Sequence, residues 1–244
     1  MRELIYGRNA VYETLRAARR EVFSVQLADG VKPAGRIVDI MELAAGSSIP
    51  ARLLPRAKLD KLNANHQGVA LEVGEYRYSD VIDILEEAGR RKEKPFVLVI
   101  DALQDPQNFG SLLRTAEAAG VHGVVIPLAR AVGVTPAVVN ASSGASEHLH
   151  IAQANLSQAI DALKESDVWI VGLDQAGQPI DDKADRHLSG AVALVVGSEG
   201  EGLHQLTRKK CDVLLKLPMK GRIESLNAAV AGSVALYLAM LVRK

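Results

Sequence analysis

The sequence predicts an α/β protein with two domains, and three observations support this prediction. Short runs rich in Val, Ile and Leu alternate with helix-like segments, as in a parallel sheet that helices cover on both faces. Hydrophobic residues make up 48% of the chain and aromatic residues only 4%, a composition that suits close packing of helices on a sheet. The length of 244 residues is enough for two modest domains.

The N-terminal 75 residues contain enough alternating segments for a small α/β domain. We expect helices over residues 7–18 and 34–46, and extended segments over residues 21–28, 51–54 and 66–73. Residues 76–95 change character, with five Lys or Arg, five Asp or Glu and a proline at the end. We interpret 76–95 as a charged linker with a short helix, which leaves residues 1–75 and 96–244 as the two domains.

Residues 96–244 repeat the pattern of a strand followed by a helix. The expected strands are "FVLVID", "GVVIP", "VWIVGL", "AVALVVG" and "VLLKLP". The expected helices are "GSLLRTAEAAG", "TPAVVNASSGA", "LSQAIDALKES", "HQLTRKKC" and the apolar C-terminal segment. This order predicts a doubly wound, mostly parallel sheet.

Composition and charge exclude several classes of protein. Cys211 is the only cysteine, which rules out an internal disulfide and any cysteine-based metal site and favours a reducing, cytoplasmic setting. The six histidines lack the spacing of a metal site, so we expect no metal. Without a long apolar run or a signal peptide, no membrane contact is expected. Residues 1–75 carry 11 Lys or Arg against 9 Asp or Glu, an excess that suits phosphate contacts or a solvated charged face.

Ligands of open α/β sheets lie beyond the carboxyl ends of the strands, and three strand exits here carry unusual loops. In the first, "DALQDPQNFGSLLRTAEAAG", Asn108 can cap the helix that follows. Gly110 costs the first turn about 1 kcal/mol relative to alanine, which indicates close approach of another backbone or a ligand. Arg114 lies one turn further on the same face, where it either snorkels to solvent or faces a polar cleft.

The second exit, "LVVGSEGEGL", places two carboxylates among three glycines. Phosphate loops supply backbone donors and a cation, whereas Glu199 and Glu201 would repel a pyrophosphate. The loop therefore suits a ligand with a positive centre or with hydroxyl and amine donors. The alternative is a tight turn with a charged tip.

The third exit, "LPMKGRIESLN", joins the last strand to the last helix. Its residues Leu217, Met219 and Leu226 can present apolar surface and backbone groups to a flat ring. Lys220 and Arg222 supply cations for a polyanion. The closing Ser-Leu-Asn has a simpler explanation as well, because serine and asparagine are good caps for a helix.

Together the three loops resemble the signature motifs of the SpoU, or TrmH-like, family of RNA ribose 2′-O-methyltransferases in the SPOUT class. The matching residues of the first motif are Asn108, Gly110 and Arg114. Those of the second are Gly197, Ser198, Glu199, Gly200 and Gly202, and those of the third are Pro218, Met219, Ser225, Leu226, Asn227, Ala228 and Ala231. The motifs also occur in the same order, and the resemblance covers residues 96–244.

The N-terminal domain resembles the small substrate-binding domain of many members, with "YGRNAVYETL" near its start and "HQGVALEV" near its end. This arrangement is similar to the branch that methylates a guanosine in bacterial 23S ribosomal RNA. The stretch "ARAVGVTPAVVNASSGASEHL" takes the place of a substrate-side loop and helix, and its "ARAVG" opening departs from the more basic pattern of that branch. The resemblance implies RNA contacts by Arg8, Asn9, Lys220 and Arg222.

The resemblance further implies a C-terminal trefoil knot, S-adenosylmethionine as the cofactor and a homodimer that uses the apolar last helix. The cofactor-binding residues that it implies are Gly197, Leu217, Met219, Ser225, Leu226 and Asn227. The activity that it implies is methylation of a ribose 2′-hydroxyl in structured RNA, with 23S ribosomal RNA as the expected partner.

The resemblance also assigns catalytic roles. In the family proposal Arg114 accepts the proton, but a guanidinium holds its own proton too strongly to be a good base. Arg114 can instead orient the ribose phosphate while Glu199 or a water takes the proton. Asn108 and Asn227 would hold the ribose or the methionine end of the cofactor, and Ser225 would polarise the acceptor hydroxyl.

Three alternative functions stay open from the sequence. A tRNA 2′-O-methyltransferase would carry the same motifs. A non-catalytic RNA-binding protein or ribosome assembly factor would keep the fold without needing Asn108, Arg114, Glu199 and Asn227 together. A nucleotide-dependent enzyme would use "GSEGEG" as its loop, although this sequence lacks the G-x-G-x-x-G spacing.

Overall fold

The structure is a computed structural model that describes residues 2–129, 131–180, 185–198, 200, 202–223 and 225–243. It divides into two compact units, which are considered separately below. The first comprises Met1–Arg77 and Val134–His148, and the second comprises Tyr78–Gly133 and Leu149–Lys244. Residues 134–148 therefore group with the N-terminal residues, although the sequence analysis assigned them to the second domain.

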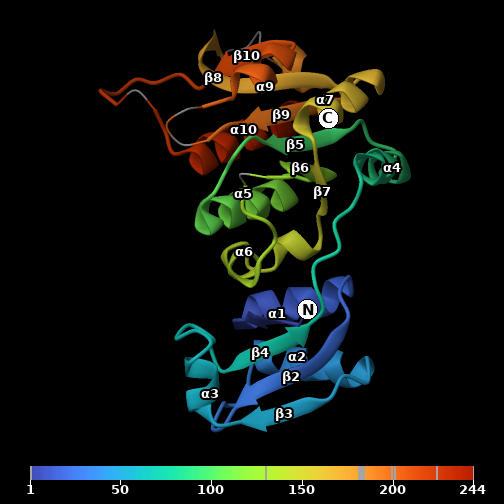
Figure 1. The fold of residues 1–244 in the computed structure, drawn as a ribbon, viewed down its shortest axis with the longest axis vertical. Coiled ribbons are helices and arrows are strands. Elements are labelled where there is room, and N and C mark those ends of the chain that lie inside the picture. Colours follow the sequence, from blue (N-terminus) through green and yellow to red (C-terminus); the bar gives the residue numbers. More distant parts are fainter. Residues whose placement is uncertain are drawn as a thin grey trace. The chain divides into compact units, whose positions relative to one another are not determined.

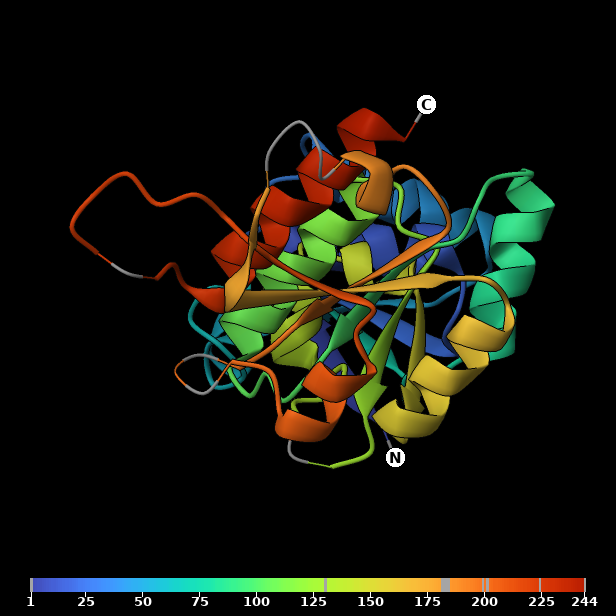
Figure 2. The ribbon, with the colours of Figure 1, turned by 90° about the horizontal axis from the view of Figure 1, so that it is seen from above.

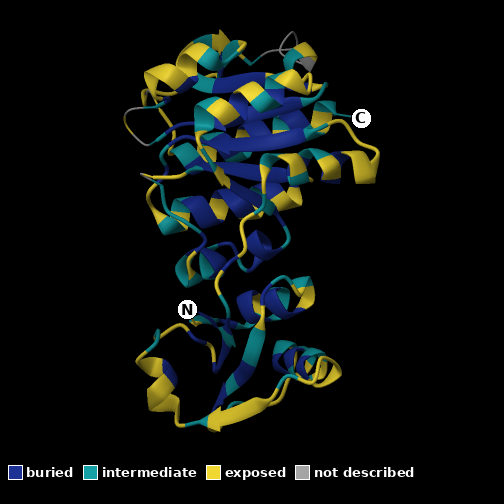
Figure 3. Ribbon diagram, turned by 45° about the vertical axis from the view of Figure 1, so that its right-hand side comes forward, coloured by how far each residue is buried: buried dark blue, intermediate teal, exposed yellow. Residues whose placement is uncertain are grey.

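The first unit is built on a four-stranded sheet (Figure 1). Its strands, in spatial order, are β1 (Glu3–Tyr6), β4 (Val69–Val73), β2 (Val22–Ala28) and β3 (Ala51–Leu54). All pairs are antiparallel except β2 with β3. Three helices belong to it: α1 (Arg8–Ala17), α2 (Arg36–Gly46) and α3 (Arg56–Asp60). The edge strand β3 and the helix α3 are mostly exposed, whereas β4 is almost fully buried (Figure 3).

Residues 134–148 pack on this unit through α6 (Pro136–Ala141) and the short 3₁₀ helix η1 (Ala145–Glu147), which contact α1 and β1. The guanidinium of Arg20 and the carboxylate of Glu147 form an ion pair at 2.9 Å, and both side chains are fully buried. The Asn140 amide donates a hydrogen bond to the carbonyl of Tyr6 at 2.9 Å. These bonds join the segment to the N-terminal sheet.

The second unit contains a six-stranded sheet in which every neighbouring pair is parallel. The spatial order is β10 (Val213–Lys216), β8 (Trp169–Pro179), β9 (Val192–Val196), β5 (Phe96–Ile100), β6 (Gly123–Pro127) and β7 (His150–Ala154). Five of these strands were predicted, so the prediction of a mostly parallel sheet is confirmed. Strand β7 was missed because only Ile151 in "HIAQA" favours a strand strongly.

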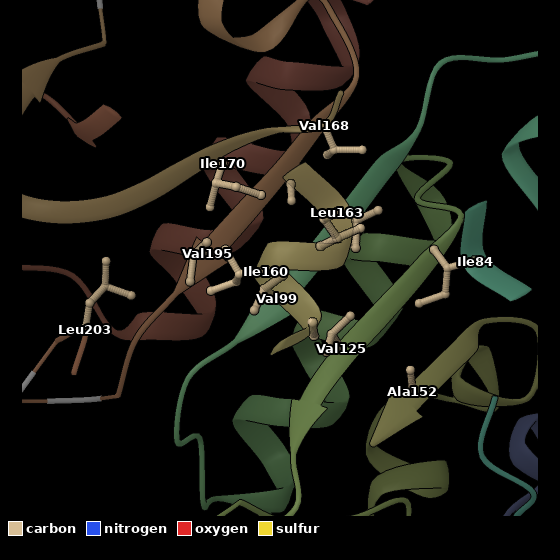
Figure 4. Packing of buried hydrophobic residues seen from close by; sticks show 13 residues of the cluster. Ile84, Val99, Val125, Ala152, Ile160, Leu163, Val168, Ile170, Val195 and Leu203 are labelled. Atoms are coloured by element: carbon tan, nitrogen blue, oxygen red, sulfur yellow. The ribbon is translucent and has the colours of Figure 1, made fainter. Parts of the chain in front are cut away.

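Two sets of helices cover the two faces of this sheet (Figure 2). One set contains α5 (Pro106–Ala118), α8 (Asp185–Leu188) and α10 (Ala228–Val242), and the other contains α4 (Val81–Arg91), α7 (Leu156–Glu165) and α9 (Gln205–Lys210). Every residue of β5 and β9 is buried, as expected for parallel strands covered on both sides. In Figure 4, Val99 and Val195 lie in one apolar cluster with Ile160 and Leu163 of α7.

Helix α4 lies in the stretch that the sequence analysis interpreted as a linker. Its residue Ile84 is fully buried in the same apolar cluster, and an alanine in place of Gly123 would bring a Cβ to 2.5 Å from it. A capping box between Asp80 and Asp83 fixes the start of the helix. The charged stretch is therefore in large part an element of the second unit.

The connection from β10 to α10 is a long loop that projects away from the sheet (Figure 2). It crosses from the edge strand β10 to a helix that contacts β9 and α5. None of the helices in the described part of the chain combines the length and the apolar character needed to cross a bilayer.

Candidate functional site

The sheet of the second unit has a topological switch point between β5 and β9. The chain leaves β5 through α5 toward β6, and it leaves β9 through α9 in the opposite direction, past β8 to β10. Connections that diverge in this way leave a crevice at the carboxyl ends of the two strands. The first and second motif loops begin at this crevice.

Asp101 and His204 tie these two loops together. Asp101 follows β5 directly, is only 4% exposed, and donates its backbone N–H to the carbonyl of Val196 in β9. Its carboxylate accepts a hydrogen bond from the backbone N–H of His204 at 2.9 Å and lies 2.8 Å from the His204 Nδ1. The sequence analysis did not single out this pair, although an aspartate directly after a buried strand is a visible signal.

The second motif loop is a closed turn. Ser198 and Gly202 exchange backbone hydrogen bonds of 3.0 and 3.2 Å. A Cβ on Gly197 would lie 2.2 Å from the Gly202 carbonyl oxygen, and Gly200 and Gly202 have φ values of 95° and 68°. Glycine is therefore needed at these positions for steric reasons. Glu199, a predicted catalytic residue, lies outside the described residues.

The start of α5 corrects the predicted cap. Asp105, and not Asn108, caps the helix, because its carboxylate accepts hydrogen bonds from the N–H groups of Gln107 and Asn108 at 2.7 and 2.8 Å. Pro106 then occupies the first helical position, where its missing N–H costs nothing. The Asn108 side chain is left for another contact, in which its Oδ1 accepts a hydrogen bond from the Nδ2 of Asn227 at 3.3 Å.

Asn227 also caps α10. Its Oδ1 accepts hydrogen bonds from the N–H groups of Ala229 and Val230 at 2.9 and 3.2 Å. The capping role that the sequence analysis weighed is therefore confirmed for this asparagine, and its Nδ2 reaches the first motif in addition. With Asp101 and His204 joining the first two loops, the Asn108–Asn227 bond connects the third loop to them.

Helices α5 and α10 pack closely beside the site. A Cβ on Gly232 would lie 2.9 Å from Leu112 Cδ1 and 3.1 Å from Val196 Cγ2. The hydroxyl of Ser233 donates a hydrogen bond to the Thr115 hydroxyl at 2.9 Å. This packing fixes the helix starts that carry Asn108 and Asn227.

Arg114 is an exposed residue on α5. Its neighbours Leu112, Leu113 and Ala116 are fully buried, so the arginine lies on the opposite, accessible side of the helix. In the third loop Ser225, Lys220 and Arg222 are exposed. The predicted cofactor contacts in this loop are accessible to different degrees: Met219 and Leu226 are each 38% exposed, and Leu217 is half-buried.

Several titratable residues outside the three motifs have structural surroundings that account for them. Burial raises the pKa of the Cys211 thiol to about 11, so this thiol stays protonated at neutral pH. His148 pairs with Glu13, and His150 lies 3.1 Å from the Ser79 hydroxyl. Within the described ranges, no three His, Cys, Asp or Glu side chains gather as metal ligands would.

Two family models match the chain. A sequence model of the SpoU rRNA Methylase family matches residues 95–237, which is more than half of the chain and contains all three motif loops. The chain belongs to the SpoU rRNA methylase family. A second model, described as RNA 2′-O ribose methyltransferase substrate binding, matches residues 4–79. The family resemblance predicted from the motifs is confirmed.

Curated relatives of this SpoU family member match along nearly the whole chain. A putative TrmH family tRNA/rRNA methyltransferase, YacO of Bacillus subtilis, is 40% identical over 237 residues, covering 96% of this chain and 94% of the relative. A putative TrmH family tRNA/rRNA methyltransferase of Staphylococcus epidermidis is 38% identical and covers 96% of this chain and 93% of that protein.

Solved structures agree on the fold. The SpoU methyltransferase AviRb of Streptomyces viridochromogenes, in complex with the cofactor AdoMet, superposes with a TM-score of 0.80 at 23% identity, covering 98% of this chain and 90% of AviRb. A structure described as an RNA 2′-O ribose methyltransferase superposes with a TM-score of 0.76 at 26% identity, covering 99% of this chain and 88% of that protein. The predicted fold class, a SPOUT-type α/β domain with a small N-terminal α/β domain, is confirmed.

Proposed function

We propose that this SpoU family member transfers a methyl group from S-adenosylmethionine to a ribose 2′-hydroxyl in structured RNA. One observation carries the proposal: the pairs Asp101–His204 and Asn108–Asn227 hold the three motif loops together at the switch point of the sheet. The relatives support it by their names, putative TrmH family tRNA/rRNA methyltransferases, and one solved neighbour holds AdoMet.

The residues of the second and third motif loops suit this cofactor. Among the described residues, no atom outside the chain neighbours lies within 4 Å of the position that a Cβ would take on Gly200 or Gly202, so these residues leave the backbone open on that side. Met219 and Leu226 offer partly exposed apolar surface to an adenine ring, as a pocket for a flat ring requires. Together with Gly197, Leu217 and Ser225, they are the residues that we propose to hold the cofactor. When bound, S-adenosylmethionine supplies an electrophilic methyl group.

The remaining task of the protein is to align the ribose and help its hydroxyl lose a proton. Asn227 uses both ends of its amide for the helix cap and for Asn108, so we assign it a positioning role. Arg114 is exposed on α5, the helix whose first turn carries Asn108, and supplies a guanidinium that suits a ribose phosphate. Ser225, exposed in the third loop, is the candidate to polarise the hydroxyl, and Glu199 or a water is the candidate base.

For the substrate we propose ribosomal RNA, with a guanosine of 23S RNA as the target. The match of residues 4–79 to a substrate-binding domain supports an RNA of some size, because a unit separate from the one that carries the motif loops is available for additional RNA contacts. A tRNA substrate is the alternative, since the relatives are named for both RNAs. Mapping 2′-O-methyl groups in total RNA with and without the gene distinguishes them.

The test of the activity is Arg114→Ala. Loss of the guanidinium should lower methyl transfer by about 100-fold or more, because alignment of the reactants carries much of the rate, while the dissociation constant for S-adenosylmethionine stays within about twofold. Single-turnover transfer to RNA and calorimetry with the cofactor measure the two quantities.

Glu117→Ala is the matched control, because Glu117 is also exposed on α5. It should leave methyl transfer unchanged. Methyl transfer by Arg114→Ala at the wild-type rate would show that this arginine has no role in the reaction. A wild-type protein that binds RNA but no S-adenosylmethionine would favour the non-catalytic alternative.

A further inference from the structure

The first unit contains a hollow that the motifs of the second unit do not explain. Its volume is about 630 Å³, and its walls include Arg8, Val31, Lys32, Arg56, Gln67 and Gly68. None of the lining residues, all of which are described, is acidic. Three cations therefore surround a concave surface that has no carboxylate of its own.

The backbone around the hollow is tightly built. Gln67 and Gly68 both have positive φ values, 55° and 84°, and a Cβ on Gly68 would lie 2.6 Å from the Val31 side chain. The Nε of Arg8 donates a hydrogen bond to the Gln67 carbonyl at 3.1 Å, and the backbone N–H of Arg8 donates to Gln67 Oε1 at 2.9 Å. Buried His66 accepts a hydrogen bond from the N–H of Gly68 at 2.9 Å. The turn therefore holds the Arg8 guanidinium in place.

The three cations differ from four arginines of the same unit in their pairing with carboxylates. Arg2, Arg16, Arg20 and Arg36 each form an ion pair with a carboxylate. Arg8, Lys32 and Arg56, in contrast, form no ion pair with any described residue. Like charges that converge without a counter-ion repel one another, and a concave surface strengthens their field toward a ligand. An external anion would relieve this repulsion.

We propose that this hollow binds the phosphodiester backbone of the RNA substrate through Arg8, Lys32 and Arg56. The proposal rests on the proposed function and adds the place and the manner of substrate contact. A guanidinium that is held by the backbone suits phosphate oxygens, and two flexible cations can follow the next phosphates of the strand. Such contacts position an RNA without reading its sequence, so target choice would come from elsewhere.

The sequence pointed to only part of this set. Arg8 was among the predicted RNA contacts, whereas Lys32 and Arg56 were not, because they lie 24 and 48 residues further along the chain. Asn9, the other predicted contact in this unit, is exposed but does not line the hollow.

The experiment uses the full chain with the double substitution Lys32→Ala/Arg56→Ala, because both side chains are exposed and neither forms an ion pair with a described residue. RNA affinity is measured by fluorescence anisotropy over a range of salt concentrations. Loss of two phosphate contacts should reduce the slope of log K against log salt by about 1.4 to 1.8, and should weaken binding roughly 10-fold or more at about 100 mM salt. Cofactor affinity should not change.

Two further variants sharpen this measurement. Arg16→Ala removes an exposed cation of the same unit that already pairs with Glu13, so it should lose little affinity and keep the wild-type slope. Lys32→Arg/Arg56→Lys keeps both charges and should bind RNA within about twofold of wild type, since point charges suffice for phosphates. An equal loss in Arg16→Ala and in the double alanine variant would overturn the proposal.

A small free anion could bind the same three cations. Competition and binding experiments with inorganic phosphate distinguish this ligand from the RNA backbone. If inorganic phosphate displaces RNA no better than chloride of equal ionic strength, the RNA backbone is the ligand. Phosphate binding that Lys32→Ala/Arg56→Ala abolishes, with RNA affinity the same in this variant and the wild type, would overturn the proposal in favour of a small anion. If the wild type binds RNA with the predicted dependence on the hollow but transfers no methyl group, the proposed function fails and the binding site stands.

Discussion

Asn227 combines a structural and a functional contact in one side chain. Its oxygen satisfies two N–H groups at the start of α10, and its Nδ2 donates to Asn108 of the first motif. The two contacts use different ends of the amide, so two substitutions can separate them. Asp101 has a comparable position between the first and second loops, where its two carboxylate oxygens contact the backbone and the ring of His204.

Substitutions of Asn227 should separate folding from activity. Asn227→Asp keeps an oxygen that caps the helix, so unfolding free energy should change by less than about 0.5 kcal/mol, but it loses the donor to Asn108. Asn227→Ala loses both and should cost about 1 kcal/mol. Urea unfolding measures the change in unfolding free energy. The rate of methyl transfer should fall in both variants, because both lose the hydrogen bond to Asn108. Wild-type transfer by Asn227→Asp would show that the Asn108 contact is dispensable.

At the scale of elements, the segment formed by α6 and η1 depends on a buried ion pair. Burial raises the pKa of the Glu147 carboxyl, and the Arg20 guanidinium opposes this shift. Arg20 also contacts Glu3 at 2.6 Å and lies 4.9 Å from the centre of the Tyr76 ring. Removing one partner of such a pair leaves a buried group without compensation.

Glu147→Ala should therefore lower the free energy of unfolding by roughly 3 to 5 kcal/mol. Asp39→Ala is the comparison at a half-exposed pair with Arg36 and should cost roughly 1 kcal/mol or less. Replacing both buried partners, as in Arg20→Met/Glu147→Leu, should recover most of the loss. Urea unfolding of the full chain measures all three, and a cost below about 1 kcal/mol for Glu147→Ala would contradict the assigned role.

The same segment affects how the N-terminal unit can be studied. Val138 and Val139 of α6 are fully buried, and α6 contacts β1 and α1. Deleting residues 1–75 would remove β1 and α1 and expose these valines to solvent. Substitutions at the surface, such as those in the hollow, are therefore a cleaner test of RNA binding than truncation.

At the scale of the whole molecule, helix α10 has apolar residues on its exposed side as well as its buried side. Val230, Val234, Tyr237 and Leu241 are 48%, 42%, 45% and 63% exposed, and their spacing of four, three and four residues places them on one face. A stripe of this kind marks an interaction surface. We propose that it forms a homodimer, in which a two-fold axis would bring the same stripe of a second copy against it.

Val234→Glu tests this dimer. A two-fold interface would bury the new carboxylate twice, so the dissociation constant should rise by about 100-fold or more. Sedimentation of the wild type and the variant at micromolar concentration measures the change. Ile82→Glu, at an apolar residue of α4 that is 66% exposed, is the control and should stay dimeric. A monomeric wild type, or a dimeric Val234→Glu, would refute the arrangement.

The sequence by itself determined the strands of the second unit, the order of its motifs and the residue types at the helix starts. Strands such as Phe96–Ile100 could be predicted because burial on both faces selects an unbroken apolar run, which is a local property. The true cap of α5 was also present locally, since Asp105 precedes a proline at the first helical position.

Only the tertiary structure decided which distant residues meet. Asp101 and His204 are 103 residues apart, Asn108 and Asn227 are 119 apart, and Arg20 and Glu147 are 127 apart. The hollow likewise gathers Arg8, Lys32 and Arg56 from three separate segments. Local propensity carries no information about such pairs, because they form only when the sheet order brings the carboxyl ends of β5 and β9 together and α6 onto β1.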